Sequence, residues 1–328
     1  MANPITLPAP TSRVRIALFV VLALLCGAGV SLQSRINGQL GTDLGDGFAA
    51  ALISFGSGLI VISLVLIVSR AGRRGIGTVT RAIRAGKLPW WHTAGGIGGG
   101  LFVLSQGLVV GLLGIALFTV ATVAGQTISG MVIDARGIGK IPSKSITVTR
   151  ILGAVLALVA VLIAVLPDVR GQAHVWITVF PFAIGLLLGL QQALNGQVKT
   201  LSGSATTATF FNFVYGTAIL TVIAAVNLVI AGLPHGFPSN PVLYLGGLFG
   251  VLFIAGFALV IPVIGVLLQS LAAVSGQLLM ALLLDYVAPT STAAVAVSTV
   301  LGTILTMVAV LIASLPSRAA IRSRAARE

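Results

Sequence analysis

The sequence predicts an all-α integral membrane protein with ten transmembrane helices, arranged as a 5+5 inverted-topology repeat with both termini cytoplasmic. Three observations predict this: the composition, the spacing of the apolar runs and an internal repeat. Hydrophobic residues make up 57% of the 328 residues and charged residues only 8%. A soluble domain carries about 25% charged residues. The chain therefore lacks the polar surface of a soluble enzyme, a nucleic-acid-binding domain or a disordered protein.

Ten apolar runs have the length of a membrane-spanning helix, which is about 20 residues. Prolines at the ends of several runs support their boundaries, because proline interrupts a helix. Almost nothing separates the third run from the fourth or the eighth from the ninth, which predicts two tight hairpins. The runs are 14–34, 47–69, 91–112, 115–133, 150–166, 175–194, 205–231, 242–262, 264–284 and 291–315.

The first run has features of a signal peptide, because Arg13 and Arg15 precede it. A lipoprotein signal would have a small residue before Cys26, but Leu25 stands there. No A-x-A cleavage site follows, and the apolar run continues to Leu32. We therefore interpret the run as an uncleaved transmembrane helix.

The basic residues orient the ten helices. With the N-terminus in the cytoplasm, 17 of the 19 Lys and Arg residues lie on the cytoplasmic side, and only Arg35 and Arg170 lie outside. This asymmetry follows the positive-inside rule. The basic loop 70–89 is expected to lie on anionic lipid. The terminal segments 1–13 and 316–328 are expected to be cytoplasmic tails.

The chain also repeats itself. Leu32–Gln39 matches Leu190–Gln197 at an offset of 158 residues, and the register continues to Gly58 and Gly216. Further blocks match at offsets of 151 and 149 residues. The repeats predict one five-helix unit over 14–166, an external linker over 167–174 and a second unit over 175–315. Because five is odd, the second unit enters from the opposite side of the membrane.

The repeated motif Gln-x-x-x-Asn-Gly-Gln is followed in the first copy by Ala-Leu-Ile-Ser-Phe-Gly-x-Gly, over Ala51 to Gly58. This combination resembles the YdcZ-like branch of the drug/metabolite transporter superfamily. The resemblance covers about residues 14–315 and implies a fused pair of units. It also implies an exporter in a bacterial inner (plasma) membrane.

The repeated amides are the first candidates for a transport pathway. Gln33 and Asn37 share one helix face near the outer end of the first helix, and Gln191 and Asn195 do so near the inner end of the sixth. The two pairs are therefore expected at opposite mouths of one pathway. The alternative is structural: Asn-Gly ends each helix, with Gly in the left-handed conformation, and Gln33 bonds a neighbouring helix.

Other polar and aromatic residues in the helices are further pathway candidates, because buried polar groups in a membrane face protein or a cavity. Each could equally hold helices together. They are Gln126 and Gln277, Ser54 and Asn212 with the adjacent Phe55 and Phe213, and Tyr215.

Asp134 and Asp285 end the fourth and ninth helices, where a carboxylate opposes the helix dipole and needs a donor or a cation. They are candidates for gating or coupling, as is Pro181, which interrupts the sixth helix and could serve as a hinge. Asp46 and Ser204 are expected to be N-caps. No carboxylate lies in mid-helix, so the sequence does not support proton coupling through a buried acid.

No catalytic, metal or cofactor site is expected. The three His residues are dispersed, Cys26 is the single cysteine, and the glycine runs lack the spacing of a nucleotide-binding loop. The sequence therefore predicts a secondary-type transporter that moves a small organic solute by alternating access. The expected partners are that solute and the lipid bilayer, without nucleic acid; homodimerisation is left open. A lipid scramblase or flippase-like protein and a non-transporting scaffold remain alternatives.

Overall fold

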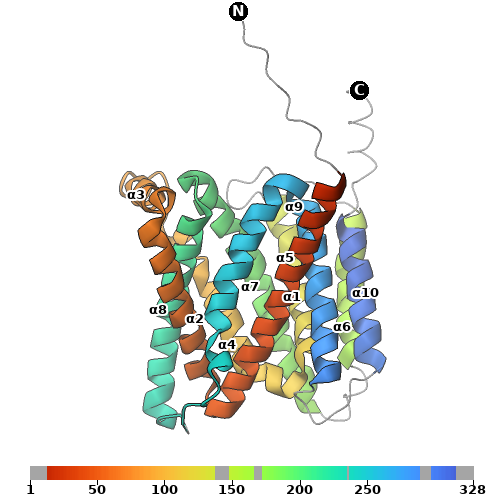
Figure 1. The fold of residues 1–328 in the computed structure, drawn as a ribbon. Coiled ribbons are helices and arrows are strands. Elements are labelled where there is room, and N and C mark those ends of the chain that lie inside the picture. The colour runs from red at the N-terminus through yellow and green to blue at the C-terminus, as the bar shows by residue number, and fades with distance from the viewer. Residues whose placement is uncertain (1–12, 137–147, 166–171, 235, 289–296, 315–328) are drawn as a thin grey trace, which may run out of the picture.

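The computed structural model describes residues 13–136, 148–165, 172–234, 236–288 and 297–314, and no strand occurs in these ranges. The helices form one bundle, with α1 beginning at the same end as α3 (Figure 1). The α-helices are α1 (Arg13–Leu44), α2 (Gly47–Val68), α3 (Arg70–Arg84), α4 (Gly96–Leu113), α5 (Ile115–Arg136), α6 (Val148–Val165), α7 (Gln172–Ser202), α8 (Ala205–Ala231), α9 (Gly246–Val287) and α10 (Val297–Ser314). Two 3-10 helices are η1 (Trp90–Thr93) and η3 (Pro241–Tyr244).

Six of the described helices are long and apolar enough to cross a membrane: α1, α2, α4, α5, α7 and α8. Shorter apolar segments occur in α6, in α10 and at each end of α9. These lengths and compositions agree with a multi-pass membrane protein.

The starts of α2 and α8 follow the prediction. Asp46 accepts hydrogen bonds from the backbone N–H groups of Phe48 and Ala49, and Ser204 accepts one from Thr207. These side chains satisfy donors that the first helical turn leaves free. The two N-caps are therefore confirmed.

The structural alternative for the Asn-Gly pairs is wrong in one respect, since neither pair ends its helix. α1 continues to Leu44 and α7 continues to Ser202. The glycines that follow these ends, Gly45 and Gly203, have φ values of 63° and 66°. Glycine adopts this left-handed conformation at little cost, so Gly45 and Gly203 can end the two helices. Both ends lie more than one turn beyond the Asn-Gly motif.

Two other boundaries also differ from the prediction. The segment expected as a basic loop forms α3, a strongly amphipathic helix whose Gly72, Gly75 and Val79 are buried. The third predicted helix begins at Gly96 instead of residue 91, because η1 occupies the preceding turn.

The eighth and ninth predicted helices follow one another without a gap in α9, and the chain folds back on itself between them (Figure 1). Contacts with α1 show the same reversal. Gly256 lies against Cys26, and Ala273 lies against the adjacent Gly27. Residues 256 and 273 of a straight helix would be about 26 Å apart, so the two arms of α9 must form a hairpin.

The α4–α5 pair forms the equivalent hairpin around Gly114, whose φ is 77°. The rings of Phe102 and Phe118, one on each arm, have centroids 5.8 Å apart. Among the six long apolar helices, α4 and α5 are the most buried, and Val110 and Phe118 are fully inaccessible.

The principal helix contacts join the two halves of the chain. α1 packs on the α9 hairpin, α7 on the α4–α5 hairpin, and α2 on α8. α6 and α10 pack against each other at one edge of the bundle (Figure 1). Their exposed large apolar side chains, including Leu162 and Leu311, are typical of helices at the periphery of a bundle.

Candidate functional site

A buried network of polar side chains lies toward the end of the bundle at which α1 ends. We call it the distal cluster, and it consists of Gln33, Ser34, Asn37, Ser54 and Gln106. The Asn37 side-chain N–H donates to Gln106 Oε1 at 2.6 Å, and Gln106 Nε2 donates to Ser34 Oγ at 2.8 Å. Gln33 Nε2 donates to the backbone oxygen of Gly246 at 2.7 Å. The last bond joins α1 to α9, and therefore the two halves of the chain.

Two oxygens of the distal cluster have no partner among the described residues: Asn37 Oδ1 and Ser54 Oγ. Asn37 is 0% exposed and Ser54 is 1% exposed. Both oxygens lie against Gly246, where any side chain would collide with them. An unpaired buried polar group is costly, so this pair needs an explanation.

The proximal cluster lies toward the opposite end of the bundle, the end that contains α3. It consists of Gln191, Asn195 and Asn212. Gln191 Nε2 and Asn195 Nδ2 both donate to Asn212 Oδ1, at 2.8 and 2.9 Å. Both bonds stay within the second half of the chain. Gln191 and Asn195 are also less buried than their equivalents Gln33 and Asn37.

The proximal cluster also contains an unpaired oxygen. Gln191 Oε1 is buried without a partner among the residues that the structure describes. Gln191 and Asn195 lie against Gly99 and Gly95 of the first half. These glycines correspond to Gly250 and Gly246 at the repeat offset, so both clusters face the same kind of surface.

The rings of Phe55 and Phe213 lie between the two clusters. Their centroids are 5.0 Å apart, with an interplanar angle of 44°. Phe55 packs against Gly216, and Phe213 packs against Gly58. The contacts are reciprocal because these residues are equivalent in the two repeats.

Each phenylalanine also approaches one cluster. A Cβ at Gly250 would meet both Gln33 Nε2 and the Phe213 ring, and one at Gly99 would meet both Gln191 Nε2 and the Phe55 ring. The distal cluster, the two rings and the proximal cluster therefore form one continuous series of contacts through the interior.

Close glycine contacts also join helices of the two repeats. Gly27 lies against the backbone of Ala273, and Gly185 lies against the backbone of Thr122. These pairs are equivalent at offsets of 158 and 151 residues. The absence of side chains lets the helices approach closely, as in small-xxx-small contacts.

The other pathway candidates are not brought into the two clusters. The backbone of Gln126 lies against Gly185, and the backbone oxygen of Gln277 accepts a 2.6 Å hydrogen bond from Ser31. Neither side-chain amide makes a hydrogen bond to the described residues. Tyr215 accepts a bond from Thr93 of η1 at 3.1 Å.

Pro181 lies inside α7, as expected, and is buried. The side chain of Asp134 falls outside the described residues. Asp285 accepts hydrogen bonds from the backbone N–H groups of Ile115 and Ala116, at 2.9 and 2.7 Å. The donors expected for a carboxylate at a helix C-terminus are therefore supplied by the start of α5.

Sequence reasoning missed Gln106, which is fully buried at the centre of the distal network. Its amide in an apolar helix was a visible signal, but its repeat equivalent is Phe257, so Gln106 is not one of the repeated polar residues. His92, whose Nδ1 lies 2.5 Å from Gln197 Oε1, was missed for the same reason, since its repeat equivalent is Leu243. Within the described ranges, no group of three or more His, Cys, Asp or Glu residues could hold a metal ion.

The fold and the two related polar clusters define a helical membrane protein built from two copies of one unit. Comparison with known families agrees: the model described as "Putative inner membrane exporter, YdcZ" matches residues 18–163 and 176–312. The chain belongs to this family, as its motifs indicated, and carries the family unit twice.

One solved structure, titled "Crystal structure of protein", is similar to this chain with a TM-score of 0.57 and 15% sequence identity. The match covers 94% of this chain and 99% of that one. At this identity the likeness shows the fold alone. No curated protein matches the chain.

Proposed function

We propose that this protein is a secondary-type transporter that exports a small organic solute by alternating access. The observation that carries the proposal is the pair of repeat-related amide clusters, which lie in opposite halves of the bundle with the Phe55–Phe213 contact between them. A carrier needs a site that opens alternately to either side. Two equivalent gates around a central barrier meet this requirement.

The proposed topology has ten membrane crossings and cytoplasmic termini. The six long apolar helices supply six crossings, and the four shorter apolar segments supply the rest. The basic helix α3 and the start of α1 lie at one end of the bundle (Figure 1). The positive-inside rule makes that end cytoplasmic, so the proximal cluster faces the cytoplasm and the distal cluster faces outward.

The hydrogen bonds suggest which gate is closed. In the distal cluster, Gln33 bonds Gly246 across the two halves. In the proximal cluster, the equivalent Gln191 bonds Asn212 within its own half and is less buried. We assign this arrangement to a conformation in which the Gln33–Gly246 bond closes the outer gate and the inner gate lacks the equivalent bond.

The inverted repeat predicts the opposite conformation. Gly246 corresponds to Gly95, so the outward-open state would have Gln191 Nε2 bonded to the Gly95 oxygen and Gln33 released from Gly246. The close glycine contacts of α1 with α9 and of α7 with α5 would be the surfaces on which the halves rock. Exchanging one hydrogen bond for its equivalent keeps the two states similar in free energy, as a carrier requires.

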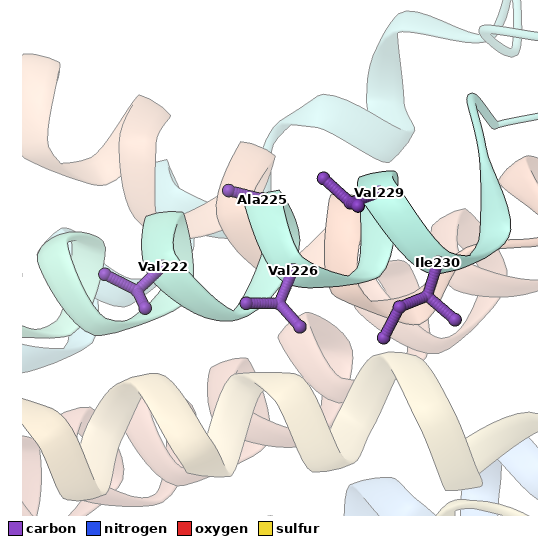
Figure 2. A pocket seen from close by; sticks show the side chains of 5 residues that line it. All are labelled: Val222, Ala225, Val226, Val229 and Ile230. Atoms are coloured by element: carbon purple, nitrogen blue, oxygen red, sulfur yellow. The ribbon is translucent and has the colours of Figure 1, made fainter.

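The alternative of a lipid scramblase requires a polar track that faces the bilayer. An open groove on the outer surface of α8 is lined by apolar side chains, with Val222 and Val226 among them (Figure 2). Val229 and Ile230 in this groove are 87% and 79% exposed. Such a surface suits acyl chains and offers a lipid headgroup no polar partner, so the buried polar path favours a carrier.

Counterflow in proteoliposomes tests the proposal. Liposomes loaded with one unlabelled solute are diluted into the same labelled solute, and a panel of metabolites and toxic compounds is screened. A carrier accumulates label transiently and saturably. The control is Gly58→Leu with Gly216→Leu, which fills both ring contacts and should abolish the exchange. Accumulation that does not saturate, or that survives in the control, would contradict the proposal.

A further inference from the structure

In both amide clusters, the side-chain nitrogens and the side-chain oxygens differ in whether they have a hydrogen-bond partner. The side-chain nitrogens of Gln33, Asn37 and Gln106 each donate to an acceptor within or beside the distal cluster. Those of Gln191 and Asn195 both donate within the proximal cluster. Each of these five amide nitrogens therefore has a partner already.

The oxygens of the same clusters are different. Asn37 Oδ1, Ser54 Oγ and Gln191 Oε1 are buried and have no partner among the described residues. An amide oxygen can accept two hydrogen bonds and a hydroxyl can both donate and accept. The buried atoms of the two clusters that lack any partner among the described residues are therefore oxygens.

Two of these oxygens converge on one point. Asn37 Oδ1 extends from α1 and Ser54 Oγ from α2, and both lie against Gly246 at the start of α9. In the conformation described, Gly246 covers them with a Cα that offers at most a weak C–H contact. When the Gln33–Gly246 bond opens, these oxygens become available to a solute.

We propose that the transported solute presents N–H or O–H donors to these oxygens, first to Gln191 at the inner gate and then to Asn37 and Ser54 at the outer gate. The side chains of the two clusters restrict the solute further. All of them are amides or hydroxyls, and none carries a charge. A neutral or zwitterionic solute fits this environment better than a net cation. The inference rests on the proposed transport function and names the substrate class.

Matched pairs of solutes test the inference. Each pair differs only in methylation of the donor group: an amino acid and its N-trimethyl betaine, a primary amide and its N,N-dimethylamide, an alcohol and its methyl ether. Thermal stabilisation of the purified protein and counterflow are measured for every member. We expect the stabilising and transported members to be donors, with methylation reducing the apparent affinity at least about tenfold. Equal activity of the methylated members would overturn the inference and leave the carrier function intact. Stabilisation by no member would also overturn it.

A pair of serine variants on α2 separates a binding role from a structural one. Ser54→Ala removes an unpaired oxygen, so the empty protein should keep or raise its melting temperature, because an unsatisfied buried group is costly. The same variant should lose affinity for the donor solutes. Ser63→Ala is the control, since Ser63 Oγ donates to the Leu59 oxygen of its own helix, and it should leave affinity unchanged. Unchanged affinity in Ser54→Ala and in Asn37→Leu would show that water alone occupies the site.

Discussion

Phe55 and Phe213 occupy equivalent positions in the two repeats, and their rings meet with centroids 5.0 Å apart. Each ring also lies against the other repeat's glycine, Gly216 or Gly58. The contact therefore lies on the pseudo-two-fold axis that relates the repeats. A barrier at this position is the same seen from either side of the membrane, which suits a protein that opens in both directions.

The first prediction concerns the glycines at these rings. Gly58→Ala and Gly216→Ala each place a methyl group where a phenylalanine ring now lies. Overpacking of this kind costs about 1–3 kcal/mol, so both variants should lower thermal stability and counterflow to a similar extent. Gly56→Ala on α2 is the control, because a Cβ there meets nothing within 4 Å. Strong loss in one variant with normal activity in the other would contradict the symmetric barrier.

The second prediction concerns the latch between Gln33 and Gly246. Gln33→Met keeps the side-chain volume but removes the donor, at a cost of about 0.5–1.5 kcal/mol to the outward-closed state. The population of outward-open molecules should rise several-fold. Gln191→Met should act in the opposite sense, because the inward-closed state needs the equivalent bond. Single-molecule energy transfer between labels on the two halves measures both shifts; shifts in the same direction would contradict the exchange of latches.

The third prediction concerns Asp285. Asp285→Asn weakens the two hydrogen bonds to the start of α5, which are worth about 1.5–3 kcal/mol each when the acceptor is charged. The melting temperature should fall, while transport per folded molecule changes only modestly. Asp43→Asn is the control, because Asp43 is exposed and accepts from Gln39 alone among the described residues. Complete loss of gradient-driven accumulation in folded Asp285→Asn would identify this acid as a coupling site instead.

The fourth prediction concerns topology. A reporter fused after Arg324 should report the cytoplasm, and one inserted within residues 235–240 should report the outside. The basis is the distribution of Lys and Arg, with 17 of 19 residues assigned to the cytoplasmic side. The same side for both reporters would rule out ten crossings with inverted repeats.

Much of the fold could be predicted from sequence because membrane helices must satisfy their backbone internally and are therefore long and apolar. The N-caps Asp46 and Ser204 could be predicted because each stands at the start of a run. The ends of α1 and α7 could not. Helix hydrogen bonding continues through Asn37 and Asn195 because their side chains bond neighbouring helices rather than their own backbone.

The candidate site could be predicted only where it obeys the repeat. Gln33 and Gln191 were found because both copies carry them. Gln106 was missed because its equivalent, Phe257, is apolar, and its role as the partner of Asn37 depends on how the α4–α5 hairpin packs on α1. A sequence shows which residues are polar, but the choice of hydrogen-bond partners between helices requires their positions.

Accessibility of the two repeated asparagines reports directly on alternating access through the two clusters. In a Cys26→Ala background, the thiol of Asn37→Cys is probed by an impermeant reagent from outside, and that of Asn195→Cys from inside. Asn195 is the more exposed of the two in the structure, so labelling without solute should be faster in the Asn195→Cys variant. A transported solute should change the two labelling rates in opposite senses, because one conformational equilibrium governs both gates. Labelling rates that change in the same sense, or that do not respond to any transported solute, would contradict alternating access through these clusters.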